Sequence, residues 1–363
     1  LISLDRLARD GWLEAAALDN APAFPRGRVD YGPVIEYHRT MLATAYACFV
    51  KRADSDQRAE MAAFAAANAY WLDDFARFMS LKEANGNRMW NTWSAGKHQI
   101  HNPPPADLDA RCEYHVFTQW QFARQWAALR AKAHAHDIRI IGDMPIFVAY
   151  DSADVWAHPH LFQLDKRGMM TFVAGVPPDY FSATGQLWGN PLYDWDACRR
   201  EGFAWWIERC RTLLQVVDIA RIDHFRGFAA SWHVPAGSAT AEKGAWVPAP
   251  GVAVFDALRS ALGAAPIIAE DLGLITPDVK ALRDRYGFPG MKILQFGFGG
   301  TASNEFLPHN FPRHCVAYTG SHDNDTVRGW FERESEAVRD HVRRYLGVSG
   351  DDIAWDMIRC LLA

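Results

Sequence analysis

The stretch Ile219-Ala220-Arg221-Ile222-Asp223 is a short apolar run, interrupted by one arginine, that ends in a carboxylate. Its isoleucines favour a buried β-strand. Residues two apart on a strand point to the same side of it, so we expect Arg221 and Asp223 to be neighbours in space. The run therefore predicts a strand that brings a charged pair to its C-terminal end.

The same design recurs in the rest of the chain. The other runs are Arg139-Ile140-Ile141-Gly142-Asp143, Ile267-Ile268-Ala269-Glu270-Asp271, Lys292-Ile293-Leu294-Gln295-Phe296 and Val316-Ala317-Tyr318-Thr319-Gly320, which leads to Ser321-His322-Asp323. Helical patterns lie between many of them, over residues 203–217, 252–262 and 276–286. In the last of these, we expect Thr276 to cap the helix and Pro277 to occupy its first turn. This alternation predicts parallel β/α organisation.

Polar residues at the C-terminal ends of successive parallel strands are typical of a (β/α)8 TIM barrel, whose active site is built at that rim. About five such strands are visible, whereas a closed barrel of this type needs eight. We therefore expect an α/β fold in which residues 1–363 form a partial catalytic barrel domain. The remaining strands are expected to lie before Leu1 and after Ala363, outside this chain.

Two insertions are expected in that barrel. The first is mainly helical and covers about residues 34–136, with helical periodicity over 34–81 and 114–136. The run Pro103-Pro104-Pro105 cannot lie inside a helix and marks a boundary between them. The second covers about residues 151–200, is rich in aromatic residues, Pro and Gly, and is interpreted as a substrate loop.

The composition excludes several classes of protein. With 49% hydrophobic and 22% charged residues, the 363-residue chain is typical of a globular protein with a substantial core. A net charge of -5 gives no basic surface for phosphates, so we expect no nucleic-acid partner. No apolar run reaches the roughly 18 residues of a membrane span. The six cysteines form no CxxC pair, and no secretory signal is visible, so reduced thiols and a cytoplasmic location are expected.

Three carboxylates follow different predicted strands: Asp223, Glu270 and Asp323. The guanidinium of Arg221 is expected to lower the pKa of Asp223 and keep it ionised. Glu270 follows an apolar strand, which favours a raised pKa. One ionised and one protonated carboxyl group about 5 Å apart are what retaining glycoside chemistry requires, as nucleophile and general acid.

The simpler interpretation is that each carboxylate caps a helix or forms a turn, which is the most frequent role of a single aspartate after a strand. Glu270 and Asp271 add an ambiguity, because adjacent strand residues point to opposite sides and only one of the two faces a cleft. If capping were the only role, three carboxylates would follow three different predicted strands by coincidence. The pattern therefore favours a shared site.

Five segments carry a resemblance to a known family. They are Arg221-Ile222-Asp223-His224-Phe225-Arg226-Gly227, Ala269-Glu270-Asp271-Leu272-Gly273, Ser321-His322-Asp323-Asn324-Asp325-Thr326, the stretch from Gly142-Asp143-Met144-Pro145 to Asp154-Val155-Trp156, and Gly185-Gln186-Leu187-Trp188-Gly189-Asn190-Pro191. Together they resemble the signature segments of the amylomaltases, which are the 4-α-glucanotransferases (disproportionating enzymes) of glycoside hydrolase family 77. Five long motifs in the right order make the match specific, and it covers essentially the whole chain.

The resemblance implies an enzyme that transfers a segment of an α-1,4-glucan to the 4-hydroxyl of an acceptor by a retaining double displacement. Maltooligosaccharides and α-1,4-glucans would be donors, and glucose or a maltooligosaccharide would be the acceptor. The mechanism requires no cofactor and no metal. Amylomaltases also have a Ser-Pro-Tyr segment that contributes an aromatic sugar contact, and this chain lacks it.

The resemblance also implies roles for single residues. Asp223 would be the nucleophile, Glu270 the acid/base, and Asp323 the carboxylate that binds sugar hydroxyls and favours the distorted ring of the transition state. The residues with binding roles would be Arg221, which orients Asp223; Asp143, His224 and His322, which contact the first donor sugar; and Trp188, which lies over the acceptor subsites in the segment matching the family's mobile loop.

Two other features have simpler interpretations. Among the fifteen tryptophans most are expected in the core, and Trp156, Trp188 and Trp195 are the candidates for sugar contact. His158-Pro159-His160 lacks a third ligand at a diagnostic spacing and is interpreted as a surface loop. Two alternative functions remain at this point, which are a glucan hydrolase of the α-amylase type and a non-catalytic glucan-binding barrel.

Overall fold

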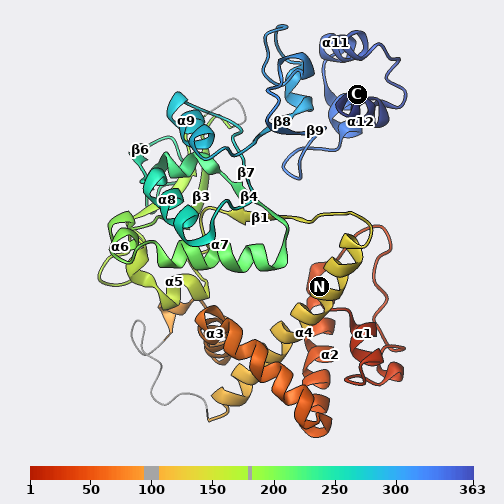
Figure 1. Cartoon of the computed structure of the whole chain (residues 1–363), viewed down its shortest axis with the longest axis vertical. Coiled ribbons are helices and arrows are strands. Elements are labelled where there is room, and N and C mark those ends of the chain that lie inside the picture. The colour runs from red at the N-terminus through yellow and green to blue at the C-terminus, as the bar shows by residue number, and fades with distance from the viewer. Residues whose placement is uncertain (94–105, 179–181) are drawn as a thin grey trace.

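The computed structural model describes residues 1–93, 106–178 and 182–363. The predicted boundary at Pro103-Pro104-Pro105 lies outside these residues. The described part is a mixed α/β structure in which helices predominate at both ends of the chain and the strands lie in the middle (Figure 1). No helix in the described ranges is long and apolar enough to cross a membrane.

The helices and strands have the following bounds. The α-helices are α1 (Leu4–Arg9), α2 (Tyr31–Arg52), α3 (Ser55–Ala84), α4 (Leu108–His134), α5 (Ala153–Ala157), α6 (Trp195–Arg200), α7 (Ala204–Val216), α8 (Gly251–Leu262), α9 (Pro277–Arg285), α10 (Val327–Arg333), α11 (Glu336–Leu346) and α12 (Ile353–Leu362). The strands are β1 (Ile141–Pro145), β2 (Phe172–Val176), β3 (Gln186–Pro191), β4 (Ile219–Asp223), β5 (Ala230–Pro235), β6 (Ala245–Pro248), β7 (Ile267–Ala269), β8 (Gly290–Ile293) and β9 (Cys315–Tyr318).

The five strands predicted from the apolar runs are β1, β4, β7, β8 and β9. They pair in parallel, with β4 between β1 and β7 in one sheet and β8 beside β9 in another. A backbone hydrogen bond of 2.9 Å from Ala269 to Pro289 joins the end of β7 to the residue before β8. The helices α7, α8 and α9 alternate with these strands, so the predicted parallel β/α alternation is confirmed.

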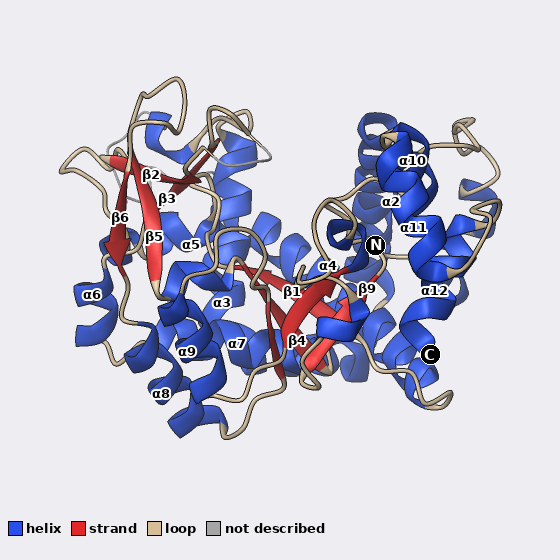
Figure 2. Ribbon diagram, turned by 90° about the horizontal axis from the view of Figure 1, so that it is seen from above, coloured by secondary structure: helices blue, strands red, loops and turns tan. Residues whose placement is uncertain are grey.

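A further, four-stranded sheet has the strand order β3-β2-β5-β6 and is antiparallel throughout (Figure 2). This sheet was not predicted, because its strands are short and contain Gly and Pro, and because the pairing of β2 with β5 that joins its two hairpins spans a long stretch of the chain. Two of its strands, β2 and β3, lie in the segment 151–200 that was interpreted as a loop. This segment therefore has regular structure of its own.

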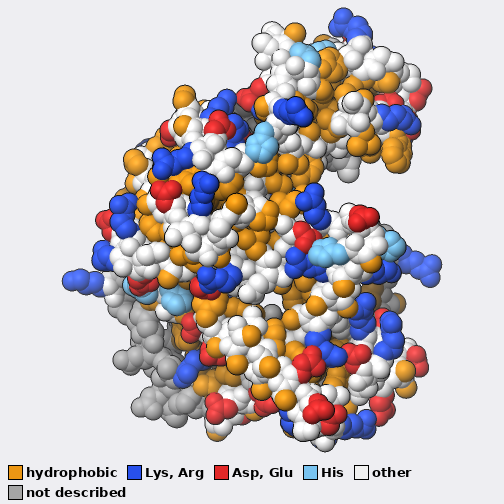
Figure 3. All heavy atoms as spheres, viewed as in Figure 1, with side chains coloured by type: hydrophobic (Ala, Val, Ile, Leu, Met, Phe, Trp, Pro, Cys, Tyr) orange, Lys and Arg blue, Asp and Glu red, His pale blue; other side chains and the backbone are white. Residues whose placement is uncertain are grey.

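The helical part of the chain consists of α2, α3 and α4, and it has its own apolar cluster around Phe49, Phe117 and Trp120. A larger core packs α7 and α8 against the strands, with Trp206 and Phe228 among its fully buried side chains. Hydrophobic side chains also gather over the central part of the face drawn in Figure 3, between the helical part below and the C-terminal helices above. The strands thus lie between two helix-rich regions.

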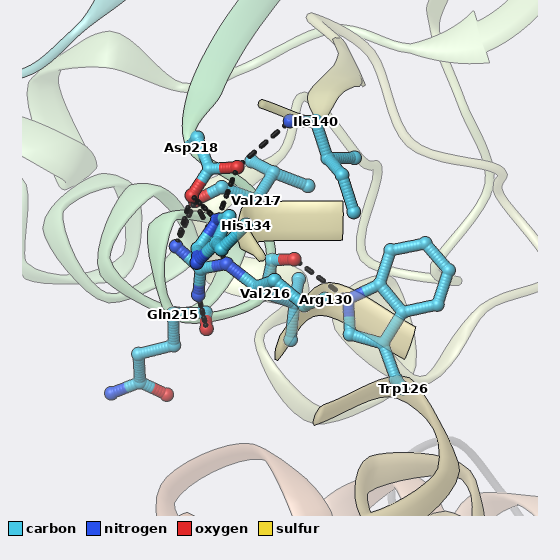
Figure 4. A network of polar contacts seen from close by, with 8 residues as sticks. All are labelled: Trp126, Arg130, His134, Ile140, Gln215, Val216, Val217 and Asp218. Carbon is cyan, nitrogen blue, oxygen red and sulfur yellow. Dashed lines mark hydrogen bonds and ion pairs between the residues drawn. The ribbon is translucent and has the colours of Figure 1, made fainter. Parts of the chain in front are cut away.

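One carboxylate joins the helical part to the strands. Asp218, just before β4, accepts hydrogen bonds from the guanidinium of Arg130, from Nε2 of His134 and, at 2.7 Å, from the backbone N–H of Ile140 before β1 (Figure 4). The indole N–H of Trp126 donates to the carbonyl of Val216 at 2.6 Å in the same network. These bonds fix α4 against the N-terminal ends of β1 and β4.

We predict that Asp218→Asn lowers the free energy of unfolding at neutral pH, because an amide cannot replace the charge that Arg130 faces. The backbone N–H of Ile140, then His134 and Arg130, hold the pKa of Asp218 below its usual value of 3.8. A lowered folded-state pKa stabilises the protein above pH 3.8, and this contribution is lost as the pH falls below it. Urea unfolding followed by circular dichroism should therefore show a deficit near pH 7 that shrinks at about pH 3.

The matched control is Asp340→Asn, which removes an exposed pair with Arg344 on α11. It should change the free energy of unfolding by no more than about 1 kcal/mol. Equal stability of wild type and Asp218→Asn at neutral pH would contradict this account of the network.

Candidate active site

The site is built around Arg221, whose side chain is 8% exposed in the middle of the parallel strands. Its Nη1 donates to both carboxylate oxygens of Asp143 at 2.6 Å, and its Nη2 pairs with Oδ1 of Asp223 at 2.9 Å. Asp143 is the direct register partner of Arg221 on β1. The predicted contact between Arg221 and Asp223 is confirmed, and Asp143 joins the same cluster.

Arg221 lowers the pKa of Asp223 as predicted, but other effects outweigh it and the net shift is upward. Burial raises the pKa of Asp223 above its usual value, and the charges of Asp143 and Asp323 raise it further, while Arg221 opposes the shift. Arg221 divides its donors between two carboxylates, so it compensates for burial only in part. Sequence alone did not indicate that Asp143 shares the guanidinium.

Glu270 lies one residue beyond the last paired residue of β7, and the backbone holds it on both sides. Its N–H donates to the carbonyl of Ile222 at 3.0 Å, and its carbonyl accepts from the N–H of Phe225 at 3.1 Å. Its carboxylate accepts from the backbone N–H of His224 at 2.8 Å and from that of Leu272 at 2.9 Å. These main-chain contacts, which no sequence motif reveals, hold the carboxyl group beside the end of β4.

Glu270 is 9% exposed. Burial raises the pKa of its carboxyl group to about 7, and the negative charge of Asp223 adds to the shift, while the backbone N–H groups and Arg221 oppose it. The predicted raised pKa of Glu270 is therefore confirmed. At neutral pH this group exchanges a proton readily, which is the property required of a general acid and base.

The neighbouring carboxylate, Asp271, points to the other side of the strand. It is ion-paired with Arg283 of α9 and accepts from the backbone N–H of Met291 at 2.7 Å. A Cβ atom at Gly290 would lie 2.5 Å from its Oδ2, so this close packing requires glycine there. Asp271 thus holds β8 against β7, and Glu270 is the member of the pair left to face Asp223.

His224 has an uncommon backbone conformation, with φ of +50°. Left-handed conformations of this kind cost energy in a non-glycine residue and are frequent in functional sites. Burial lowers the pKa of its imidazole to about 4, so the ring is neutral at neutral pH. Its Nε2 is buried and has no hydrogen-bond partner among the described residues.

Trp188 of β3 packs against His224 with its ring perpendicular and the ring centres 4.7 Å apart. It is 37% exposed. The other two tryptophans proposed for sugar contact are less open, since Trp156 is in the core and Trp195 is partly buried against it. Trp156 is buried against Phe78, and Trp195 stacks on the fully buried Trp206. Burial of Trp156 leaves little of its ring for a sugar, whereas Trp195 is only half-buried and stays a candidate.

Asp323 and His322 lie in the turn after β9, and both side chains are about two-thirds exposed. The charge of Asp323 acts on Asp223, as its contribution to the pKa of Asp223 indicates. Asp323 also lines a cavity of about 580 Å³. Its other lining residues include Gln295, Phe296, Phe306, Asn324 and Trp330. The structure thus places an open, mixed apolar and polar space beside the third carboxylate.

The two histidines of His158-Pro159-His160 each lie near one carboxylate, away from the cluster around Arg221. His158 lies 3.6 Å from Asp74, and His160 lies 2.6 Å from Glu201. Within the part of the chain that the structure describes, no group of three or more His, Cys, Asp or Glu side chains is arranged to hold a metal ion.

Comparisons with known proteins agree on one family. The family model described as 4-alpha-glucanotransferase matches residues 1–363. A 4-alpha-glucanotransferase from Thermus thermophilus is 48% identical, with 99% of this chain aligned to 73% of that protein. A 4-alpha-glucanotransferase from Synechocystis sp. is 50% identical, with the same coverage of both chains. An amylomaltase from Streptococcus agalactiae, solved in complex with acarbose, has a TM-score of 0.94 at 37% identity, over 100% of this chain and 74% of that one.

We predict that Glu270 gives the carboxylic acid signal that titrates near neutral pH. In an infrared titration, the C=O band of a protonated carboxyl group should disappear with a midpoint at about pH 7. Asp223→Asn should move the midpoint to lower pH, because it removes the negative charge that raises the pKa of Glu270. The band should be absent in Glu270→Gln. If it persists in Glu270→Gln with an unchanged midpoint, another group titrates there and this description of the site is wrong.

Proposed function

This chain belongs to the 4-alpha-glucanotransferase family, and from that premise we propose that it transfers a segment of an α-1,4-glucan to the 4-hydroxyl of glucose or a maltooligosaccharide. The donors are maltooligosaccharides and α-1,4-glucans. The reaction proceeds with retention by double displacement at the cluster of Asp223, Glu270 and Asp323.

We further infer that β1, β4, β7, β8 and β9 are strands of a (β/α)8 barrel. Their parallel pairing, the alternation with α7, α8 and α9, and the likeness to a solved amylomaltase support this inference. In such a barrel, residues 34–136 are a helical insertion and residues 151–200 are a substrate-side insertion. The clustering of charged residues at the C-terminal ends of β1, β4 and β7 agrees with the position of active sites in this fold.

In the first step, a carboxylate oxygen of Asp223 attacks the anomeric carbon of the donor sugar. The glycosidic C–O bond breaks, and its oxygen takes the proton of the Glu270 carboxyl group, so that the leaving glucan departs as a neutral alcohol. The products are a covalent glucosyl ester on Asp223 and an ionised Glu270. The ion pair with Arg221 directs the attacking oxygen of Asp223 and opposes the rise in its pKa that burial causes.

In the second step, the 4-hydroxyl of the acceptor attacks the same carbon. Ionised Glu270 takes the hydroxyl proton, the ester bond breaks, and Asp223 returns to its charged form. Two inversions restore the original configuration. A pKa near neutrality suits Glu270 to both roles, because the group must donate a proton in one step and accept one in the next.

The surrounding residues support these steps in our proposal. Asp323 binds sugar hydroxyls and favours the distorted ring of the transition state, and His322 joins it in the same turn. The free Nε2 of His224 meets a sugar hydroxyl of the first donor unit, and Asp143 lies at the same subsite. Trp188, exposed beside His224, offers an apolar face to the acceptor sugar and limits access of water.

The observation that carries the proposal is the contrast between two neighbouring carboxyl groups. Asp223 is partly exposed and ion-paired at 2.9 Å, whereas Glu270 is buried and surrounded by main-chain donors. This contrast assigns the charged role to one group and the protonated role to the other. Binding of a glucan without catalysis does not require two carboxyl groups with such different environments.

Incubation of the protein with maltotriose tests the proposal. Transfer should give glucose together with a ladder of oligosaccharides longer than maltotriose, resolved by chromatography. Glu270→Gln should reduce the rate by about 10²- to 10⁴-fold, because it removes the proton donor. Products that are all shorter than maltotriose would identify a hydrolase. Binding of maltotriose without turnover would identify a binding protein. Either result contradicts the proposal.

A further inference from the structure

Arg226 is a buried cation that the steps above do not use. It follows β4 by three residues and is 6% exposed. Its Nη1 donates to the carbonyl of Leu274 at 2.8 Å and to Oγ1 of Thr276 at 3.0 Å. Both acceptors belong to the segment that runs from Glu270 to α9. Arg226 therefore ties the segment after β4 to the segment after β7.

Thr276 was expected to cap α9, and the structure confirms its position at the helix start but not a capping hydrogen bond to its hydroxyl. The hydroxyl accepts from Arg226 instead. The threonine thus anchors the segment that precedes the helix, and Leu272 within that segment donates its N–H to Glu270.

One face of the Arg226 guanidinium lies over an aromatic ring. Cζ of Arg226 is 3.7 Å from the ring centre of Trp246 on β6. A buried guanidinium this close to an indole has a strong cation–π interaction. Since β6 is one edge of the four-stranded sheet, Arg226 holds that edge of the sheet.

The opposite edge of the same sheet meets the same segment. Trp188 lies on β3, the other edge strand, and packs on His224, two residues before Arg226. Residues 224–226 therefore contact both edge strands of the sheet. The position of the sheet, and with it that of Trp188, is linked through Arg226 to the segment that carries Glu270.

We propose that Arg226 is a positioning residue that couples the four-stranded sheet to the Glu270 segment and keeps the acid/base aligned beneath Trp188. It acts through Leu274, Thr276 and Trp246. The inference rests on the proposed role of Glu270.

The expected functional effect follows from the contacts of Glu270. Without Arg226 the segment 271–276 loses two anchors, and the hydrogen bond from the N–H of Leu272 to Oε1 of Glu270 weakens. That hydrogen bond lowers the pKa of Glu270, so its loss raises the pKa. The other groups that act on Glu270 are Asp223, Arg221 and the N–H of His224, and the substitution leaves all three in the chain.

The test compares Arg226→Met with Arg226→Lys by the pH profile of kcat/KM for transfer. Methionine keeps apolar contact with Trp246 but has neither charge nor donors. We expect Arg226→Met to lower kcat about 2- to 30-fold and to move the alkaline limb to higher pH. Arg226→Lys retains a cation and a hydrogen-bond donor, so its alkaline limb should lie close to the wild-type pH.

Arg124→Met is the matched control. The guanidinium of Arg124 lies 5.1 Å from the ring centre of Trp120 in the helical part of the chain, away from the site. This variant loses a cation–π contact of the same kind and should leave the alkaline limb unchanged. Should Arg226→Met fail to fold, Thr276→Val serves in its place, because it removes one acceptor and should shift the limb in the same direction by a smaller amount.

The inference would be overturned if Arg226→Met folds normally and its alkaline limb lies at the same pH as that of the wild type. A loss of activity that only follows the folded fraction would also overturn it, because that indicates a purely structural role. Full activity of Glu270→Gln would instead refute the proposed function, so the two failures are distinguishable.

Discussion

The site depends on one buried cation between two strands. Arg221 on β4 bonds Asp143 on β1 with one guanidinium nitrogen and Asp223 with another. A buried guanidinium without partners is costly, so the two carboxylates and the cation stabilise one another as a set. The parallel register that makes Asp143 the direct neighbour of Arg221 is therefore also what orients the nucleophile in our proposal.

The second organising feature is the difference in environment between two adjacent strand ends. β4 ends in a partly exposed carboxylate, and β7 is followed by a buried one held by main-chain donors. The left-handed backbone at His224 turns one of those donors toward Glu270 and places a neutral imidazole beside Trp188. One short segment after β4 thus follows the nucleophile directly and contacts both the acid/base and Trp188.

Much of this arrangement was predictable from the sequence, because parallel strands with β-branched interiors have a local signal and their C-terminal ends meet at one edge. β1, β4 and β9 were predicted within one or two residues, and the pairing of Arg221 with Asp223 followed from strand periodicity. The antiparallel sheet was not predictable, since its strands are short and interrupted by Gly and Pro and its central pairing, β2 with β5, is between distant segments. The net pKa shift of Asp223 and the core position of Trp156 also depend on burial, which composition does not reveal.

The central claim is that Asp223 becomes covalently attached to the sugar, and trapping that ester tests it most directly. An α-maltooligosaccharyl fluoride needs no proton from the acid/base, so Glu270→Gln should react with it and accumulate the intermediate. Mass spectrometry of the digested protein should then find the glycosyl mass on the peptide that contains Asp223. Release of fluoride with the adduct on another residue, or with no adduct on any peptide, would contradict the account.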